Sequence, residues 1–117
     1  MQTAQQTQQT WVEVCTIDDL QEYSGVCALL NDEQVAIFMV PSAHNTHLYA
    51  ISNWDPVGQA NVLYRGIIGS VASTPVVASP LHKQRYDLIT GQCLDDDSVS
   101  IDVFTVRQEQ GRVLIAV

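Results

Sequence analysis

Short runs of apolar and β-branched residues, separated by turn-forming residues, recur along most of this chain. The runs GVCALL at 25–30 and QVAIFMV at 34–40 flank Asn31-Asp32-Glu33, a spacing typical of a β-hairpin. A third run, HLYAIS, follows at 47–52. Strands at this spacing, with so little helical periodicity between them, predict an all-β sandwich or barrel of antiparallel strands.

Further strand-like runs occupy the second half of the chain. VLYR, IIGSV and TPVVAS lie within residues 62–79 and are separated by glycine and serine. Residues 99–103 alternate apolar and polar side chains, the two-residue period of a half-buried strand. The final run at 112–117 is expected to pair with that strand across 108–111. Helix is predicted only within CTIDDLQEY, where Thr16 and Asp19 have capping-box spacing.

The length of 117 residues fits one domain, which we place at residues 10–117. Residues 1–9 are rich in Gln and Thr and carry no apolar block, so we expect a disordered polar tail there. A secretory signal needs a basic start and a hydrophobic centre, and this tail has neither. We therefore expect a cytoplasmic protein.

The charge is strongly negative, with five Lys and Arg against 13 Asp and Glu and a formal net charge of −8. Such a surface repels phosphate backbones, and no basic stripe is present to neutralise them. Nucleic acid and anionic membranes are therefore poor partners, and no apolar run is long enough to span a bilayer. A protein with a basic face is the better candidate.

The three cysteines, Cys15, Cys27 and Cys93, form no close pair. Their spacing gives neither a disulfide framework nor a CxxC metal motif. Each one stands beside apolar residues, where a free cysteine behaves as a small hydrophobe. We expect all three to pack in the core.

Two turn-rich loops stand out from the strand pattern. The first is NWDPVG at 53–58 and the second is SPLHK at 79–83. Each is fed by a strand, so the two could lie side by side at one tip of the fold, as a small two-loop subdomain.

The second loop and the strand after it carry a family pattern. SPLHKQRYDLITGQCL at 79–94 resembles the Rieske iron–sulfur domain, whose second loop reads Cys-Pro-x-His-Gly before an aromatic-Asp-x-x-x-Gly strand and turn. The residues that match this pattern are Pro80, His82, Tyr86, Asp87 and Gly91. The family's first loop reads Cys-x-His, and the resemblance places Asn53 and Asp55 at those two positions.

The four expected cluster-ligand positions are degenerate. A Rieske cluster takes two thiolates and two imidazoles, whereas this chain offers Asn53, Asp55, Ser79 and His82. An amide and a hydroxyl are poor substitutes for the soft anionic sulfur that iron–sulfide centres select. We therefore expect no cluster, no other cofactor and no metal on this chain.

Clusterless Rieske-like domains of this length resemble the small subunits of the NADH-dependent, ammonia-forming nitrite reductases of nitrate assimilation. The resemblance spans residues 10–117 and includes WVEVCTIDDL and ANVLYRGIIGS. It implies a large-subunit partner that carries flavin, an iron–sulfur cluster and sirohaem. The chain itself would then be a non-catalytic subunit that docks on, stabilises or regulates that partner.

Two other functions remain open at this point. One is a cluster-bearing ferredoxin that passes electrons to an oxygenase, and the other is a free-standing protein-interaction module. For docking, the candidate partner-binding residues are Trp54, Asp55, His82 and Lys83. Exposed tryptophan is enriched at interface hot spots. The alternative for Trp54 is that it folds back into the space of a cluster.

Several other patterns have a simpler explanation than a site. His44, His47 and His82 could bind zinc, but no cysteine or well-placed carboxylate joins them. Asp95-Asp96-Asp97 reads as a solvated acidic loop. Ser79, Asp55 and His82 suggest a catalytic triad, yet the strained GxSxG elbow that exposes such a serine is absent.

Overall fold

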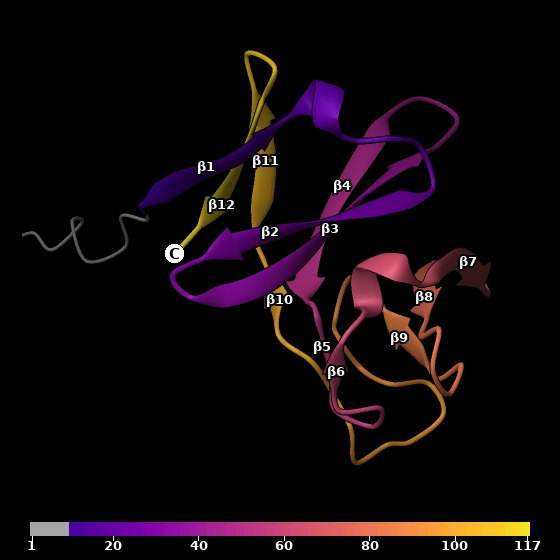
Figure 1. The fold of residues 1–117 in the computed structure, drawn as a ribbon. Coiled ribbons are helices and arrows are strands. Elements are labelled where there is room, and N and C mark those ends of the chain that lie inside the picture. The colour runs from indigo at the N-terminus through magenta and orange to yellow at the C-terminus, as the bar shows by residue number, and fades with distance from the viewer. Residues whose placement is uncertain (1–9) are drawn as a thin grey trace, which may run out of the picture.

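The computed structural model describes residues 10–117, and its regular secondary structure is almost entirely β-strand, with two short 3-10 turns (Figure 1). The tail expected at residues 1–9 lies outside the described residues. No helix in the described part is long and apolar enough to cross a bilayer. In chain order the elements are β1 (Trp11–Thr16), η2 (Ile17–Asp19), β2 (Ser24–Leu30), β3 (Glu33–Pro41), β4 (Thr46–Ser52), β5 (Trp54–Asp55), β6 (Ala60–Asn61), η3 (Leu63–Arg65), β7 (Ile67–Val71), β8 (Thr74–Ala78), β9 (Arg85–Asp87), β10 (Val103–Phe104), β11 (Val106–Glu109) and β12 (Arg112–Ala116).

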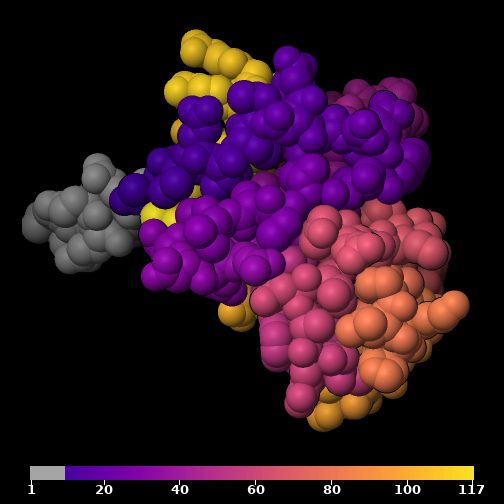
Figure 2. Space-filling view, in the orientation of Figure 1, coloured from indigo at the N-terminus to yellow at the C-terminus, as the bar shows by residue number. Residues whose placement is uncertain are grey.

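The strands form four antiparallel sheets in two parts. The larger part holds the sheets β1-β12-β11 and β10-β4-β3-β2, and the smaller part holds β5-β6 and β7-β8-β9. Figure 2 shows this division as an indigo-to-magenta body above a pink-to-orange one. The all-β prediction is confirmed, and the smaller part contains the predicted two-loop subdomain.

The predicted hairpin of β2 and β3 is confirmed, and its turn explains its position. Leu30 pairs with Glu33, which leaves Asn31 and Asp32 as a two-residue connection. Both have positive φ, 50° and 70°. Asn and Asp tolerate this left-handed conformation best among residues with a side chain, and it matches the twist of the strands.

Strand β3 is buried on both faces, which is why its sequence is continuously apolar. Val35 and Ile37 belong to the core between the two larger sheets, together with Val113 and Ile115. The alternate residues of β3 face the smaller part and pack in a second core. The members of that second core are Ala36, Phe38, Ile51, Leu63, Val77, Tyr86, Leu88, Cys93 and Ile101.

The segment VLYR is not a strand, contrary to its apolar pattern. Leu63 and Tyr64 both donate their backbone N–H to Asn53, the first to its carbonyl oxygen and the second to Oδ1. These bonds give acceptors to the first two N–H groups of the 3-10 turn η3, whose N-cap residue is Val62. The contact that decides this local structure comes from ten residues earlier, so periodicity could not reveal it.

The prediction of a strand at 99–103 is also wrong for most of that segment, since β10 begins only at Val103. Ile101 donates to the carbonyl oxygen of Gly91, and only Val103 and Phe104 join β4. Strand β12 pairs instead with β11 at Val106–Glu109, across a turn at Gln110-Gly111.

The short helix predicted near the start is confirmed as the 3-10 turn η2. Asp19 accepts hydrogen bonds from the N–H and hydroxyl of Thr16, as in a capping box. The three cysteines, all expected in the core, differ in their burial. Cys93 is buried and Cys15 is half-buried, but Cys27 is exposed. Cys27 therefore does not fill the core: it lies on the edge strand β2, where its sulfur lies 3.6 Å from the amide nitrogen of Asn53.

Candidate functional site

The two turn-rich loops meet through two buried polar side chains. Asp55 ends β5 and Ser79 directly follows β8. The Ser79 hydroxyl donates to Asp55 Oδ2 at 2.5 Å, and the residues are 0% and 1% exposed. The expected proximity of the loops is therefore seen, and their contact is a direct bond between side chains.

The two loops have matching local geometry around this pair. The Val57 N–H donates to Asp55 Oδ1 at 3.0 Å, and the Leu81 N–H donates to Ser79 Oγ at 3.2 Å. In both loops a proline directly follows the buried polar residue, and the residue after the proline donates its N–H back to that polar side chain. Asp55 and Ser79 therefore occupy equivalent positions in the two loops.

Tyr86 completes the hydrogen bonding of the buried carboxylate. Its hydroxyl donates to Asp55 Oδ1 at 2.8 Å. Burial by itself raises the pKa of Asp55, but bonds from Ser79, the Gly58 N–H, Tyr86 and Val57 outweigh it and hold the pKa below its usual value. Burial and the bond to this carboxylate raise the pKa of Tyr86. At this site the neutral phenol of Tyr86 and the neutral hydroxyl of Ser79 thus surround the ionised carboxylate of Asp55.

The space between the loops is filled by the protein itself. A Cβ placed on Gly58 would lie 2.6 Å from Leu81 Cδ1 and 2.9 Å from Asp55 Oδ2. Glycine at position 58 thus lets the first loop approach the second closely. We name Asp55, Ser79 and Tyr86 the loop clamp.

Asn53, which we expected beside the other ligand positions, lies apart from the clamp. Its amide nitrogen donates to Gln34 Oε1 at 3.0 Å, and its oxygen accepts from the Tyr64 N–H at 2.7 Å. Cys27 Sγ lies 3.6 Å from the same amide nitrogen. These bonds join the first loop to β2, β3 and η3, so Asn53 positions the loop instead of facing Ser79.

The exposed tip of the loops is apolar, with the cationic Lys83 beside it. Trp54, Val57 and Leu81 are 44%, 38% and 47% exposed. His82 and Lys83 are exposed as well. Trp54 therefore does not fold back into the space of a cluster. Asp55, expected to contact a partner, is fully buried and is not available to one.

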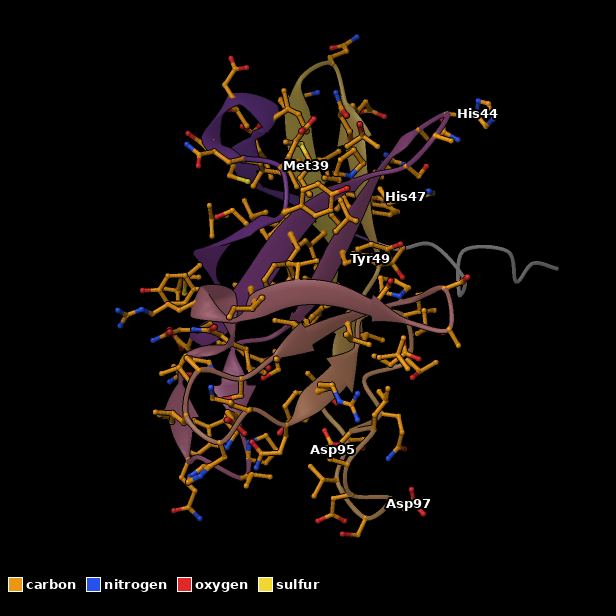
Figure 3. All side chains as sticks on the ribbon, turned by 90° about the vertical axis from the view of Figure 1, so that its right-hand side faces the viewer. Met39, His44, His47, Tyr49, Asp95 and Asp97 are labelled. Carbon is orange, nitrogen blue, oxygen red and sulfur yellow. The ribbon has the colours of Figure 1, made fainter. Side chains whose placement is uncertain are left out.

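The remaining candidate sites do not form in the described residues. No group of three His, Cys, Asp or Glu side chains there has metal-binding geometry. Figure 3 shows Asp95 and Asp97 at the end of the molecule opposite His44. Asp95 pairs with Arg85 at 2.8 Å. The Ser79 hydroxyl donates a hydrogen bond to Asp55, and among the described residues His82 makes no bond to either, so they do not form a triad.

Sequence reasoning missed two members of this site. The motif identifies Tyr86 only as an aromatic position, whereas in the structure its hydroxyl donates to the buried carboxylate of Asp55. No motif singles out Val57, although the parallel between Asp-Pro-Val and Ser-Pro-Leu in the sequence indicates that the two loops are equivalent.

A model of the Rieske-like [2Fe-2S] domain matches residues 10–116. The nitrite reductase (NADH) small subunit of Escherichia coli K12 is 45% identical over 103 residues, which cover 88% of this chain and 94% of that protein. The solved structure of the E. coli protein NirD has a TM-score of 0.83 at 43% identity, covering 94% of this chain and 98% of that one.

One further relative differs in its length. The nitrite reductase [NAD(P)H] large subunit of Klebsiella oxytoca is 33% identical over 105 residues. This match covers 90% of the present chain but 11% of the Klebsiella protein. A domain similar to this whole chain is therefore one small portion of that much longer protein.

Proposed function

We infer the function of this chain from its family: it belongs to the Rieske-like [2Fe-2S] domains and, among them, to the small subunits of NADH-dependent nitrite reductase. The chain is the accessory subunit of a cytoplasmic, assimilatory enzyme that reduces nitrite to ammonium. The observation that carries this proposal is the 45% identity to the E. coli small subunit across 94% of its length.

The partner in this proposal is the large subunit of the same enzyme. The Klebsiella relative supports it, because there a domain like this one is part of a protein named as a large subunit. Two domains that are joined in one chain in one protein often bind each other when, in a relative, they are separate chains. The large subunit carries the flavin, iron–sulfur cluster and sirohaem, and the present chain supplies none of these groups.

The clamp residues do not fit a [2Fe-2S] cluster. A Rieske cluster needs two thiolates on one iron and two imidazoles on the other. Asp55 and Ser79 offer hard oxygen atoms, and these atoms are bonded to each other at 2.5 Å with Tyr86 beside them. Soft iron–sulfide centres select sulfur ligands. The loops are therefore held together by side chains in place of a cluster.

The equivalence of Asp55 and Ser79 also changes which residues stand for the ligands. With Asp55 in the cysteine position of Cys-x-His, the histidine position falls on Val57 and not on Asp55. The second loop keeps Ser79 and His82 in its two positions. Of the four positions Asp55, Val57, Ser79 and His82, only His82 then carries a side chain that a Rieske cluster uses as a ligand. The contact between Asp55 and Ser79 supports this register, because the two thiolates of a Rieske cluster share one iron.

The loop tip is the surface with which the chain docks on the large subunit. Trp54, Val57 and Leu81 give it apolar area, and Lys83 gives it a cation. Tryptophan is among the side chains most enriched at interface hot spots. The clamp below holds the tip rigid, so docking costs little ordering entropy.

Affinity measurements with the purified large subunit test this proposal. The wild-type chain should bind, and W54A combined with H82A should weaken binding by about tenfold or more. The matched control is L29A on β2, where the leucine is 68% exposed and outside the tip. Failure of the wild-type chain to bind would refute the proposed partner. Equal binding of the tip variant and wild type would move the docking surface elsewhere.

A further inference from the structure

Strand β7 has a bare edge, whereas the opposite edge of its sheet is closed. In the sheet β7-β8-β9, β9 is followed by residues that bond to its outer side. Asp87 donates its N–H to the Gln92 carbonyl oxygen, and Leu94 donates to that of Arg85. Among the described residues, β7 pairs with β8 alone.

The register of the sheet identifies which backbone groups point outward from β7. Ser70 lies opposite Pro75, whose carbonyl oxygen accepts from the Leu88 N–H on the β9 side. A strand residue directs its N–H and C=O to the same side in an antiparallel sheet. Ser70 must therefore direct both groups away from β8, and so must Ile68, two residues earlier.

These outward groups have no hydrogen-bond partner in the described part of the chain. Neither the Ile68 N–H nor the Ser70 N–H donates to any backbone or side-chain acceptor there. Strand β7 reads Ile-Ile-Gly-Ser-Val, without charge or proline. Edges of this kind are usually blunted by charge, proline or a covering segment, because they pair readily with another extended chain.

A groove of about 440 Å³ lies beside β7 and reaches across to Pro75 of β8. Ile68, Gly69 and Ser70 form one wall, and the opposite wall includes His47 and Tyr49 of β4. The two rings stack with centroids 6.2 Å apart. Figure 3 shows both side chains along β4, above the pink strand that crosses the middle of the view.

The groove itself is lined by uncharged residues, and charged residues of both signs lie near it in the chain, including the exposed Arg65 just before β7. None of the lining residues is Asp, Glu, Lys or Arg. Glu22, which is exposed, precedes the lining residue Tyr23. Burial raises the pKa of the Tyr49 phenol, and the Asp87 carboxylate adds to this rise, which places a second anion near the wall. An uncharged lining suits a segment whose centre is uncharged.

We propose that an extended segment of the large subunit with an uncharged centre adds to β7 as a fourth strand, beside the His47–Tyr49 groove. Its backbone satisfies the outward groups of Ile68 and Ser70, as in other cases of strand addition. The chemistry specifies the occupant, because only an extended backbone offers donors and acceptors at this spacing. This interface rests on the proposed function and is separate from the loop tip.

The substitution S70P tests this interface without touching the pairing with β8. Proline removes only an outward N–H, and edge positions of this kind tolerate it. Binding of the large subunit should weaken by about tenfold or more. The matched control S70A keeps the N–H and should bind like wild type. Thermal unfolding of both variants checks that the fold is intact.

Hydrogen exchange provides a second readout that does not depend on a variant. In the complex, the amides of Ile68 and Ser70 should exchange more slowly than in the free chain. The Gly69 amide, already directed at β8, should change little.

The outcomes separate this interface from the proposed function. If wild type and S70P bind equally and the two amides stay unprotected, strand addition is refuted while the partner stands. If the free chain is a dimer with these amides protected, the occupant is a second copy and the assignment to the large subunit is wrong. If wild type does not bind, the proposed function and this interface fall together.

Discussion

The hydroxyl of Ser79 donates a 2.5 Å hydrogen bond to the carboxylate of Asp55, which stands 24 residues earlier in the chain. This bond, with that from Tyr86 to the other carboxylate oxygen, joins two loops that in a Rieske domain are joined by a cluster. The small sheet and the second core thus keep their arrangement through a carboxylate and two hydroxyl groups.

Removal of the carboxylate should destabilise the fold strongly. D55A leaves the Ser79 and Tyr86 hydroxyl groups and the Val57 N–H without their acceptor. Buried donors without partners cost enough that we expect a loss of about 2–4 kcal/mol in the free energy of unfolding, measured with urea. The control is D97A, an exposed residue, which should change it by less than about 0.5 kcal/mol. Equal stability of D55A and wild type would show that the clamp contributes nothing.

Removal of one donor should cost less than removal of the acceptor. Y86F keeps the buried ring and deletes only the hydroxyl that donates to Asp55. We expect a loss of about 1–2 kcal/mol in the free energy of unfolding. In the double variant with D55A the two losses should not add, because both delete the same bond. Full additivity in this cycle would contradict a direct interaction.

The clamp also predicts an acid dependence. The pKa of Asp55 is lowered in the folded state, so its stabilisation is full above the unfolded value of about 4 and is lost as the pH falls through the folded pKa. The difference in unfolding free energy between wild type and D55N should therefore be constant at neutral pH and shrink below about pH 4. A difference that grows on acidification would reverse the assigned sign.

Gly91 provides a separate test of the turn after β9. Its φ is +82°, and a Cβ there would clash with the Ile101 carbonyl oxygen. G91A should lower the free energy of unfolding by about 2 kcal/mol or more. The matched control G69A, where a Cβ meets nothing within 4 Å, should be close to neutral. Similar stability of the two variants would contradict the need for glycine at 91.

The paired loops also predict which substitutions would restore a cluster. D55C, V57H and S79C together, with the native His82, place two thiolates and two imidazoles at the equivalent positions of the loops. This variant should bind about two irons per chain after reconstitution and absorb visible light. The control N53C, D55H and S79C follows the register expected from the sequence and should bind none, because Asn53 faces Gln34. If instead the control variant binds iron and the first variant does not, the ligand positions are Asn53 and Asp55, as the sequence alone predicts.

Local chemistry explains which features the sequence could predict. The β2–β3 hairpin depends on Asn31 and Asp32, and the all-β class depends on alternation within single strands. Both are properties of neighbouring residues. The turn at Gly91 was predictable for the same reason.

Contacts between distant residues explain the errors. Asn53 and Asp55 are both polar and both buried, and residues two apart point to the same side of an extended chain. Only the bond from Ser79 distinguishes Asp55 as the member of the loop pair. Similarly, η3 forms where Asn53 accepts hydrogen bonds from its first N–H groups. No pattern within VLYR indicates this contact.

Iron analysis of the native chain tests most directly whether these loops exclude a cluster. The protein is reconstituted anaerobically with iron and sulfide, desalted, and examined by iron determination and visible absorption. We predict no bound iron and no visible absorption, with the clamp intact. About two irons per chain and a visible spectrum would contradict this prediction, because Asp55 and Ser79 would then have opened to admit the cluster.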